Sequence, residues 1–207
     1  MIDLSILVVF IPTFFSVSFL PGLCMTMAMT MGMTVGLRRS FYMMWGELLG
    51  VGLVSASAVL GISALMLHFP LLFMILRLGG GGYLIFLGIK MWRDRGRFEL
   101  DQRLQKMNTT SAKALMVQGF VTAMSNPKAW AFMVSLLPPF INSSKPLLPQ
   151  LSILLLLILI IEFICLVIYA GSGSTLRIFL EKSGHLRFMH KITGTLLVGL
   201  GLWLALE

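Results

Sequence analysis

The chain has 207 residues, of which 57% are apolar and only 12% are charged, and its mean hydropathy is +0.94. Soluble domains carry about 25% charged residues, whereas several runs in this chain reach the ~20 apolar residues that cross a bilayer. These numbers exclude a soluble globular domain and predict a polytopic membrane protein. The formal net charge of +8 therefore indicates membrane topology more than a nucleic-acid-binding surface.

Six hydrophobic spans are predicted along the chain. The start, MIDLSILVVF, contains an acid and no basic residue, so we expect a retained first span and not a cleaved signal peptide. Short polar or glycine-rich segments separate the later spans, including the loop expected to begin at Gly171. The spans cover residues 4–35, 41–67, 71–92, 114–141, 147–170 and 192–206.

The distribution of lysine and arginine predicts the orientation. Basic residues gather in the first, third and fifth loops, the second loop holds none and the fourth holds only Lys145. The positive-inside rule then places the odd loops in the cytoplasm and both termini outside. The one long polar stretch, residues 93–113, is expected to be a cytoplasmic loop between two halves, 1–92 and 114–207, of a single membrane domain.

Two of the six spans are interrupted near their centres. Pro21-Gly22 lies in the first span and Asn126-Pro127-Lys128 in the fourth, and a proline inside a helix removes a backbone donor and forces a bend or break. The two spans occupy equivalent places in halves of three helices each, so the halves would insert in opposite orientations. Paired breaks of this kind indicate a transport site near the bilayer midplane. A weaker echo, Gly81-x6-Gly88 and Gly194-x6-Gly201, links the third and sixth spans.

Four ionisable residues are expected within the membrane: Glu47, Arg77, Lys128 and Glu162. A charge at the centre of a spanning helix costs ~2.5–3.5 kcal/mol, so each should face a partner or water. Glu162, in LLLLILIIEFICLVIYA, suits either a protonatable coupling site or a buried ion pair with Lys128. Glu47 suits either a contact to a substrate amine or an interfacial acid beside Arg38 and Arg39. Arg77 is more simply explained as structural.

Residues near the first break offer two further patterns. Thr26, Thr30 and Thr34 form a hydroxyl stripe that lines a path or, as is common for threonine in helices, bonds to its own helix's carbonyls. The methionines at every second position from Met25 to Met33 scatter around a helix, so we interpret them as flexible packing and not as a copper site.

Four segments together are similar to one known family. SFLPGLCMTMAMTMGMTVGLRRS, LGGGGYLIFLGIKMWR, FVTAMSNPKAWAFMVSLLPPFI and ITGTLLVGLGLWLAL resemble, in order and over nearly the whole chain, the LysE/RhtB family of bacterial amino-acid exporters. That family typically shows Pro-Gly-Pro in its first span, and here Leu23 replaces the second proline. The third-span pattern is matched by Gly80, Tyr83, Leu84, Leu87 and Gly88, and the fourth by Asn126, Pro127 and Lys128.

The resemblance implies an all-α membrane protein that exports amino acids or close derivatives across the bacterial cytoplasmic membrane, driven by its ion gradient. The nearest likeness is to homoserine, homoserine lactone and threonine exporters. The expected partners are a small amino-acid substrate and lipid, with a homo-oligomer also open, and no nucleic acid, cofactor or catalytic residue is expected. Two alternatives remain. One is a membrane thiol–disulfide carrier using Cys24 and Cys165. The other is metal-ion efflux, although the sequence contains no His/Cys/Asp cluster to support it.

Overall fold

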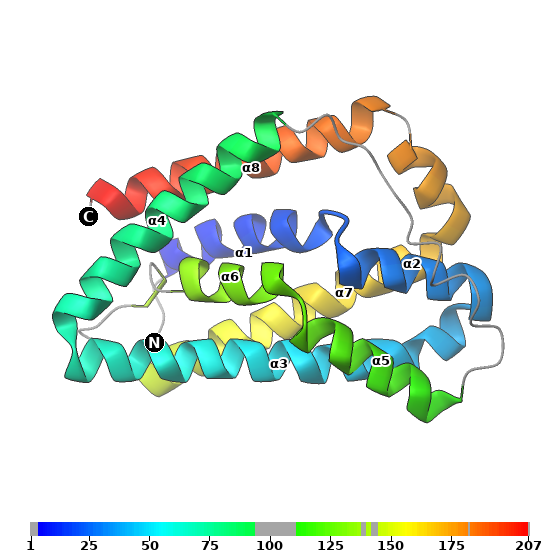
Figure 1. The fold of residues 1–207 in the computed structure, drawn as a ribbon, viewed down its shortest axis with the longest axis horizontal. Coiled ribbons are helices and arrows are strands. Elements are labelled where there is room, and N and C mark those ends of the chain that lie inside the picture. The colour runs from blue at the N-terminus through cyan, green and yellow to red at the C-terminus, as the bar shows by residue number, and fades with distance from the viewer. Residues whose placement is uncertain (1–3, 94–110, 138–139, 142–144, 182, 207) are drawn as a thin grey trace.

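The computed structural model describes residues 4–93, 111–137, 140–141, 145–181 and 183–206, with helices and no strand among them (Figure 1). Some side chains within these helices, including those of Arg77, Pro127 and Lys128, lie outside the described part. In the described residues the helices are α1 (Leu4–Phe19), α2 (Leu23–Val35), α3 (Leu37–His68), α4 (Pro70–Arg93), α5 (Ala112–Met124), α6 (Pro127–Leu136), α7 (Leu147–Glu181) and α8 (Ser183–Leu206).

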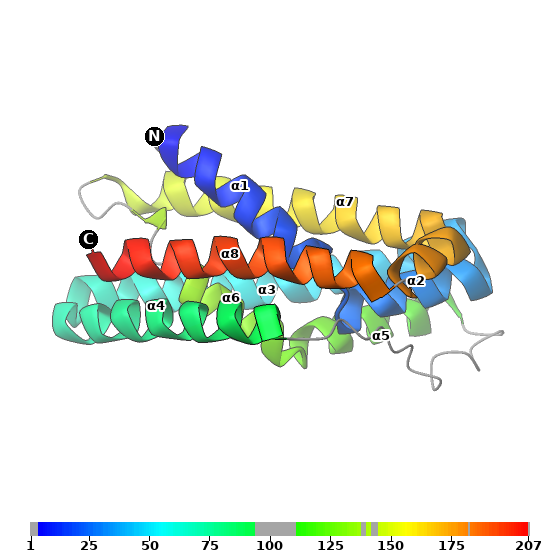
Figure 2. The ribbon, with the colours of Figure 1, turned by 90° about the horizontal axis from the view of Figure 1, so that it is seen from above.

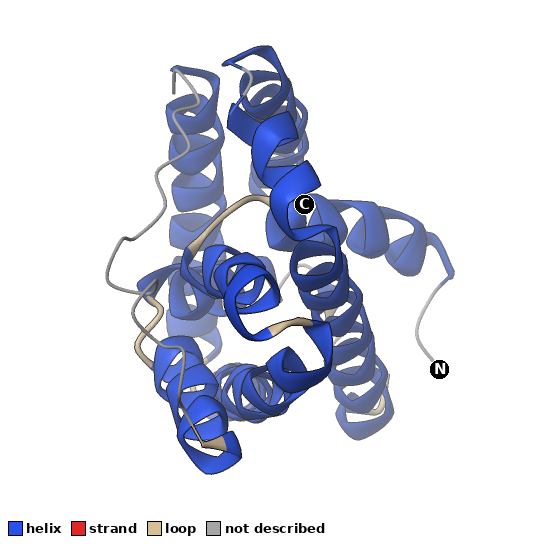
Figure 3. Cartoon of the chain, turned by 90° about the vertical axis from the view of Figure 1, so that its right-hand side faces the viewer, coloured by secondary structure: helices blue, strands red, loops and turns tan. Residues whose placement is uncertain are grey.

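The first predicted span is broken where the sequence indicates. α1 ends at Phe19, α2 begins at Leu23, and the two axes are bent by 59°. Gly22, the residue before α2, is extended, with φ −146° and ψ −172°. Toward its N-terminal end, α1 leans away from the other helices (Figures 2 and 3).

The fourth predicted span is also broken. α5 ends at Met124, and Ser125 and Asn126 separate it from α6. Pro127 is the first residue of α6, a position where its missing N–H costs nothing because that donor would have no partner within the helix. The proline therefore starts a new helix and does not bend the interior of an old one.

The last two helices are longer than expected. The predicted loop at Gly171 is wrong, because α7 continues to Glu181 through a kink at Gly173, with φ 38° and ψ −111°. This is a backbone conformation that glycine adopts more readily than other residues. α8 likewise begins at Ser183, nine residues before the expected Ile192, because a basic polar turn extends the apolar helix. The sequence Gly-Ser-Gly-Ser from Gly171 thus coincides with a kink within α7 and not with the end of a helix.

Two uninterrupted helices of the described chain are long and apolar enough to cross a membrane, at Leu37–Gly61 in α3 and Leu147–Gly173 in α7. The bent pair Leu7–Phe19 and Leu23–Val35 adds a third if it forms one span. These helices agree with a multi-pass membrane protein.

The glycine echo between the third and sixth spans is a packing contact. α4 and α8 lie side by side along their lengths (Figures 1 and 2). A methyl group on Gly88 would lie 2.6 Å from the carbonyl oxygen of Gly194, and one on Gly201 would lie 2.6 Å from that of Gly81. The two helices therefore pack backbone against backbone at two points, as small residues permit in membranes.

α3 and α5 are packed in the same way at Gly46. A methyl group there would overlap the backbone carbonyl of Met116, so Gly46→Ala is expected to destabilise the protein by about 1–3 kcal/mol, as overpacking does. Gly61→Ala is the matched control on the same helix, because no atom lies within 4 Å of the added carbon. Thermal unfolding in detergent measures the difference, and equal melting temperatures for the two variants would contradict the contact.

Candidate functional site

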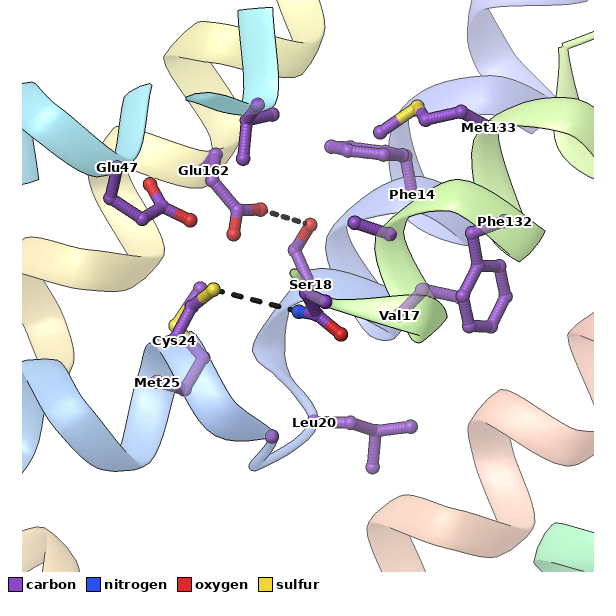
Figure 4. A pocket seen from close by; sticks show the side chains of 14 residues that line it. Phe14, Val17, Ser18, Leu20, Cys24, Met25, Glu47, Phe132, Met133 and Glu162 are labelled. Carbon is purple, nitrogen blue, oxygen red and sulfur yellow. Dashed lines mark hydrogen bonds between the residues drawn. The ribbon is translucent and has the colours of Figure 1, made fainter. Parts of the chain in front are cut away.

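Both helix breaks open onto one small pocket inside the bundle. Its volume is about 60 Å³, room for about two water molecules at ~30 Å³ each. Drug-sized ligand pockets are ~300 Å³ or larger, so the pocket is small in this structure. Its polar lining comes from five elements of the fold and comprises Ser18, Cys24, Glu47, Asn126 and Glu162 (Figure 4).

Glu162 is tied to the end of α1. The hydroxyl of Ser18 donates a hydrogen bond of 2.7 Å to its Oε2, and both side chains are buried. α7 supplies the carboxylate from the middle of its most apolar stretch, and Ser18 is the second-last residue of α1. The bond therefore couples the first helix break to the centre of α7.

Glu47 projects from α3 toward Glu162 (Figure 4). Its side chain is 0% exposed, and neither carboxylate oxygen makes a well-formed hydrogen bond to a described residue, although the group lies close enough to Glu162 and Cys24 to interact with both. Burying a charge without a partner is costly, and two carboxylates side by side repel each other. A proton or an organic cation between them would relieve both costs.

The second break contributes Asn126. Its side-chain amide donates to the sulfur of Cys24 at 3.5 Å, which links the residue before α6 to the first turn of α2. Gly22, which precedes α2, also lines the pocket and gives that helix no side-chain cap. In contrast, the hydroxyl of Ser111 caps the start of α5 by accepting from the Ala114 amide at 3.3 Å. The first amides of α2 are thus left for another acceptor.

The remaining wall of the pocket is apolar. Phe14 from α1 faces Phe132 and Met133 from α6 across it (Figure 4). Phe14 stacks on Phe10 at 5.5 Å between ring centres, and Phe10 meets Phe140 edge to face at 4.9 Å. Aromatic side chains thus extend from the pocket along α1, away from the break.

The structure brings together four of the residues that the sequence singled out. Gly22, Glu47, Asn126 and Glu162 line the pocket, and Pro21 lies beside it in the break. Glu47 is buried there and does not lie at the surface with Arg38 and Arg39, which are exposed. The side chains of Pro127, Lys128 and Arg77 are outside the described residues, so a contact between Lys128 and Glu162 stays a prediction.

The threonine stripe of α2 does not line this pocket. Thr26, Thr30 and Thr34 each donate to the carbonyl four residues earlier, at 2.8 Å in every case. This is the local bonding that threonine commonly makes in helices. The predicted packing of the methionines holds for Met25, Met27, Met29 and Met31, which are buried, but not for Met33, which is 36% exposed near the end of α2.

Sequence reasoning missed Ser18. Its hydroxyl stands three residues before Pro21, and one turn of helix therefore places it beside the break. A hydroxyl at that spacing was the available signal. Its partner could not be identified, because Glu162 is 144 residues away along the chain. The apolar pocket residues gave no signal that distinguished them from ordinary core.

The two cysteines, the basis of one alternative, are both free and buried. Cys24 lines the pocket, whereas Cys165 does not. Within the described part of the chain, no group of three or more His, Cys, Asp or Glu side chains is arranged to hold a metal ion.

Comparisons with known proteins agree with this architecture. A model of the LysE type translocator family matches residues 15–207. The homoserine/homoserine lactone efflux protein of Salmonella typhimurium is 28% identical over 75% of this chain and 74% of its own length. An uncharacterized membrane protein of Bacillus subtilis is 30% identical over 78% of this chain and 80% of its own. An uncharacterized membrane protein of Vibrio cholerae is 29% identical over 70% of both chains.

No solved structure matches the chain. The family match nevertheless covers almost all of it, including both helix breaks and all five polar pocket residues. The chain therefore belongs to the LysE type translocator family.

Proposed function

We propose that this protein exports a small amino acid or amino-acid derivative, of the threonine or homoserine kind, across the bacterial cytoplasmic membrane. The observation that carries the proposal is the pair of buried carboxylates, Glu47 and Glu162, in a pocket formed at two helix breaks. A family of translocators and an efflux protein among the relatives support export. The relative's substrates, homoserine and its lactone, share an amino group.

The carboxylates are the site for the substrate's ammonium group. Among the described residues, none makes a well-formed hydrogen bond to Glu47, so a bound ammonium would supply one without displacing a described hydrogen bond. The same ammonium would compete with Ser18 for Glu162, whose Oε2 now accepts the Ser18 hydroxyl. Binding of the substrate would thus weaken the hydrogen bond that connects Glu162 to the end of α1.

The start of α2 is the site for the opposite end of the substrate. Backbone amides and the positive end of the helix dipole favour a carboxylate or a lactone oxygen there. Lys128, beside the second break, adds a positive charge in this proposal. The apolar wall of Phe14, Phe132 and Met133 suits a short uncharged side chain.

In the proposed membrane arrangement the eight helices form six spans as two inverted repeats. The broken pairs α1–α2 and α5–α6 are the first and fourth spans, with their breaks near the midplane, and the basic loops and both termini keep the orientation predicted from the sequence. Because the pocket is smaller than an amino-acid site, the helices around it must separate to admit substrate from either side. A proton or ion gradient drives this alternating access.

Efflux from membrane vesicles loaded with a panel of radiolabelled amino acids and lactones tests the function. We expect export of one or a few small amino compounds, and slower export when a protonophore collapses the proton gradient. A vesicle preparation with the Glu47→Gln, Glu162→Gln double variant measures leakage. Equal efflux from both preparations for every compound in the panel would contradict the proposal.

The cysteines provide a test against the thiol–disulfide alternative. The double variant Cys24→Ser, Cys165→Ser is expected to export substrate at the wild-type rate, because a serine hydroxyl at position 24 can still accept from Asn126 and no thiol takes part in transport. The measurement is vesicle efflux together with the thiol content of the wild-type protein before and after turnover. Loss of activity with a change in thiol content would favour redox chemistry.

A further inference from the structure

At each helix break, the last carbonyl of the preceding helix accepts a hydrogen bond from an aromatic side chain. The last carbonyls of a helix have no amide partner within it, and in hydrocarbon no water replaces that partner. The Phe19 carbonyl, at the end of α1, accepts from the Tyr169 hydroxyl at 2.7 Å. The Met124 carbonyl, at the end of α5, accepts from the indole N–H of Trp130 at 2.9 Å.

Tyr169 holds the end of α1 against α7. Its side chain is 0% exposed, and its ring meets that of Phe19 edge to face with 5.5 Å between the centres. Tyr169 follows Glu162 by seven residues, about two turns, so both lie on one face of α7. That face therefore bonds two consecutive residues of α1, Ser18 through Glu162 and Phe19 through Tyr169.

Trp130 acts across the second break. It lies in the first turn of α6 and reaches back over Ser125 and Asn126 to the last carbonyl of α5. The bond fixes how α6 leaves α5, and with it the place of Asn126, which lines the pocket and donates to Cys24. Trp130 itself does not line the pocket, and neither does Tyr169.

We propose that Tyr169 and Trp130 are positioning residues of the transport site, each closing the carbonyl freed by one helix break and thereby placing one polar pocket residue. Tyr169 places Ser18 against Glu162, and Trp130 places Asn126 against Cys24. Both broken spans therefore have an aromatic donor that bonds the carbonyl at the break, although the two donors lie on different helices. The inference rests on the proposed function, because the pocket is taken as the transport site.

Tyr169→Phe and Trp130→Phe remove each donor and keep an aromatic ring. Matched controls are Tyr83→Phe on α4 and Trp92→Phe on the same helix, which removes an indole donor to the Lys191 carbonyl at 3.2 Å, away from both breaks. We expect the apparent KM for efflux to rise about tenfold in each of the two test variants, equivalent to ~1.4 kcal/mol, with the maximal rate little changed. The two controls should match the wild type.

A second readout needs no substrate. In a Cys165→Ser background, Cys24 is a native reporter inside the pocket, and we expect a small membrane-permeant thiol reagent to label it about tenfold faster when either donor is removed. Gly88→Ala, destabilised at the α4–α8 contact, whose residues do not line the pocket, is the stability control and should leave the labelling rate unchanged. The protein is used at full length in native membranes.

The two readouts separate failure of this inference from failure of the proposed function. Faster labelling in both test variants, but not in Gly88→Ala, supports the positioning role even if no compound in the panel is exported. Unchanged labelling in Tyr169→Phe and Trp130→Phe overturns the inference even if export is confirmed. Equal acceleration in Gly88→Ala also overturns it, because general loosening would then explain the effect.

Discussion

Glu47→Gln is expected to abolish most efflux and leave the protein at least as stable as the wild type. The wild-type carboxylate is 0% exposed and makes no well-formed hydrogen bond to the described part of the chain, and burying a charge in that setting is costly to the fold. The proposed substrate ammonium does depend on it, since a hydrogen bond to a charged group contributes ~1.5–3 kcal/mol, or about 10- to 100-fold in affinity. Vesicle efflux and thermal unfolding in detergent measure the two properties.

Ser55→Ala provides the matched control for this variant. Ser55 lies on the same helix, is also 0% exposed and has a hydroxyl without a partner, but it does not line the pocket. Its removal should affect stability alone and leave efflux at the wild-type rate. A Glu47→Gln protein that unfolds at a much lower temperature would instead show that the carboxylate is structural.

Glu162→Gln is expected to reduce efflux about tenfold or more and to remove its dependence on external pH. In the wild type, a lower external pH should speed export, because protons entering from outside displace the ammonium from the carboxylate pair and are carried inward. Glutamine cannot exchange a proton, so the residual efflux should be flat between pH 5.5 and 8, a range of about two and a half units around the ordinary operating pH. Efflux measured at fixed internal pH gives the profile.

Ser18→Ala is the companion variant for this test. It removes the hydroxyl that donates to Glu162 at 2.7 Å but keeps the carboxylate, so pH dependence should persist at an altered affinity. A Glu162→Gln profile that parallels the wild type would assign Glu162 to structure and leave coupling to another group.

The breaks were predictable because proline and glycine act through local backbone chemistry. Pro21-Gly22 and Asn126-Pro127 each combine a proline with a second residue of low helix propensity, and the structure places both interruptions there, whereas Pro12 alone lies inside α1. The loop predicted at Gly171 was wrong because a single residue with positive φ, Gly173, bends the chain and leaves the segments on either side helical. A composition rich in glycine and serine does not distinguish such a kink from a loop.

The candidate site was predictable only in part. Glu47 and Glu162 stood out because an ionisable side chain in an apolar run is costly and indicates a partner or a functional site. Their proximity depends on how α3 packs against α7, and no local pattern encodes that packing. Ser18, Tyr169 and Trp130 are ordinary residues for a membrane helix, and their roles exist only through partners on other elements or across a break.

The paired glycines of α4 and α8 constrain how the molecule can move. Gly88 meets Gly194 and Gly81 meets Gly201, so the spacing of seven residues is the same on both antiparallel helices. A slide of one helix along the other would drive side chains into backbone at both points. Shear between α4 and α8 is thereby blocked, and the pair behaves as a fixed frame against which only hinge motions of the broken helices remain.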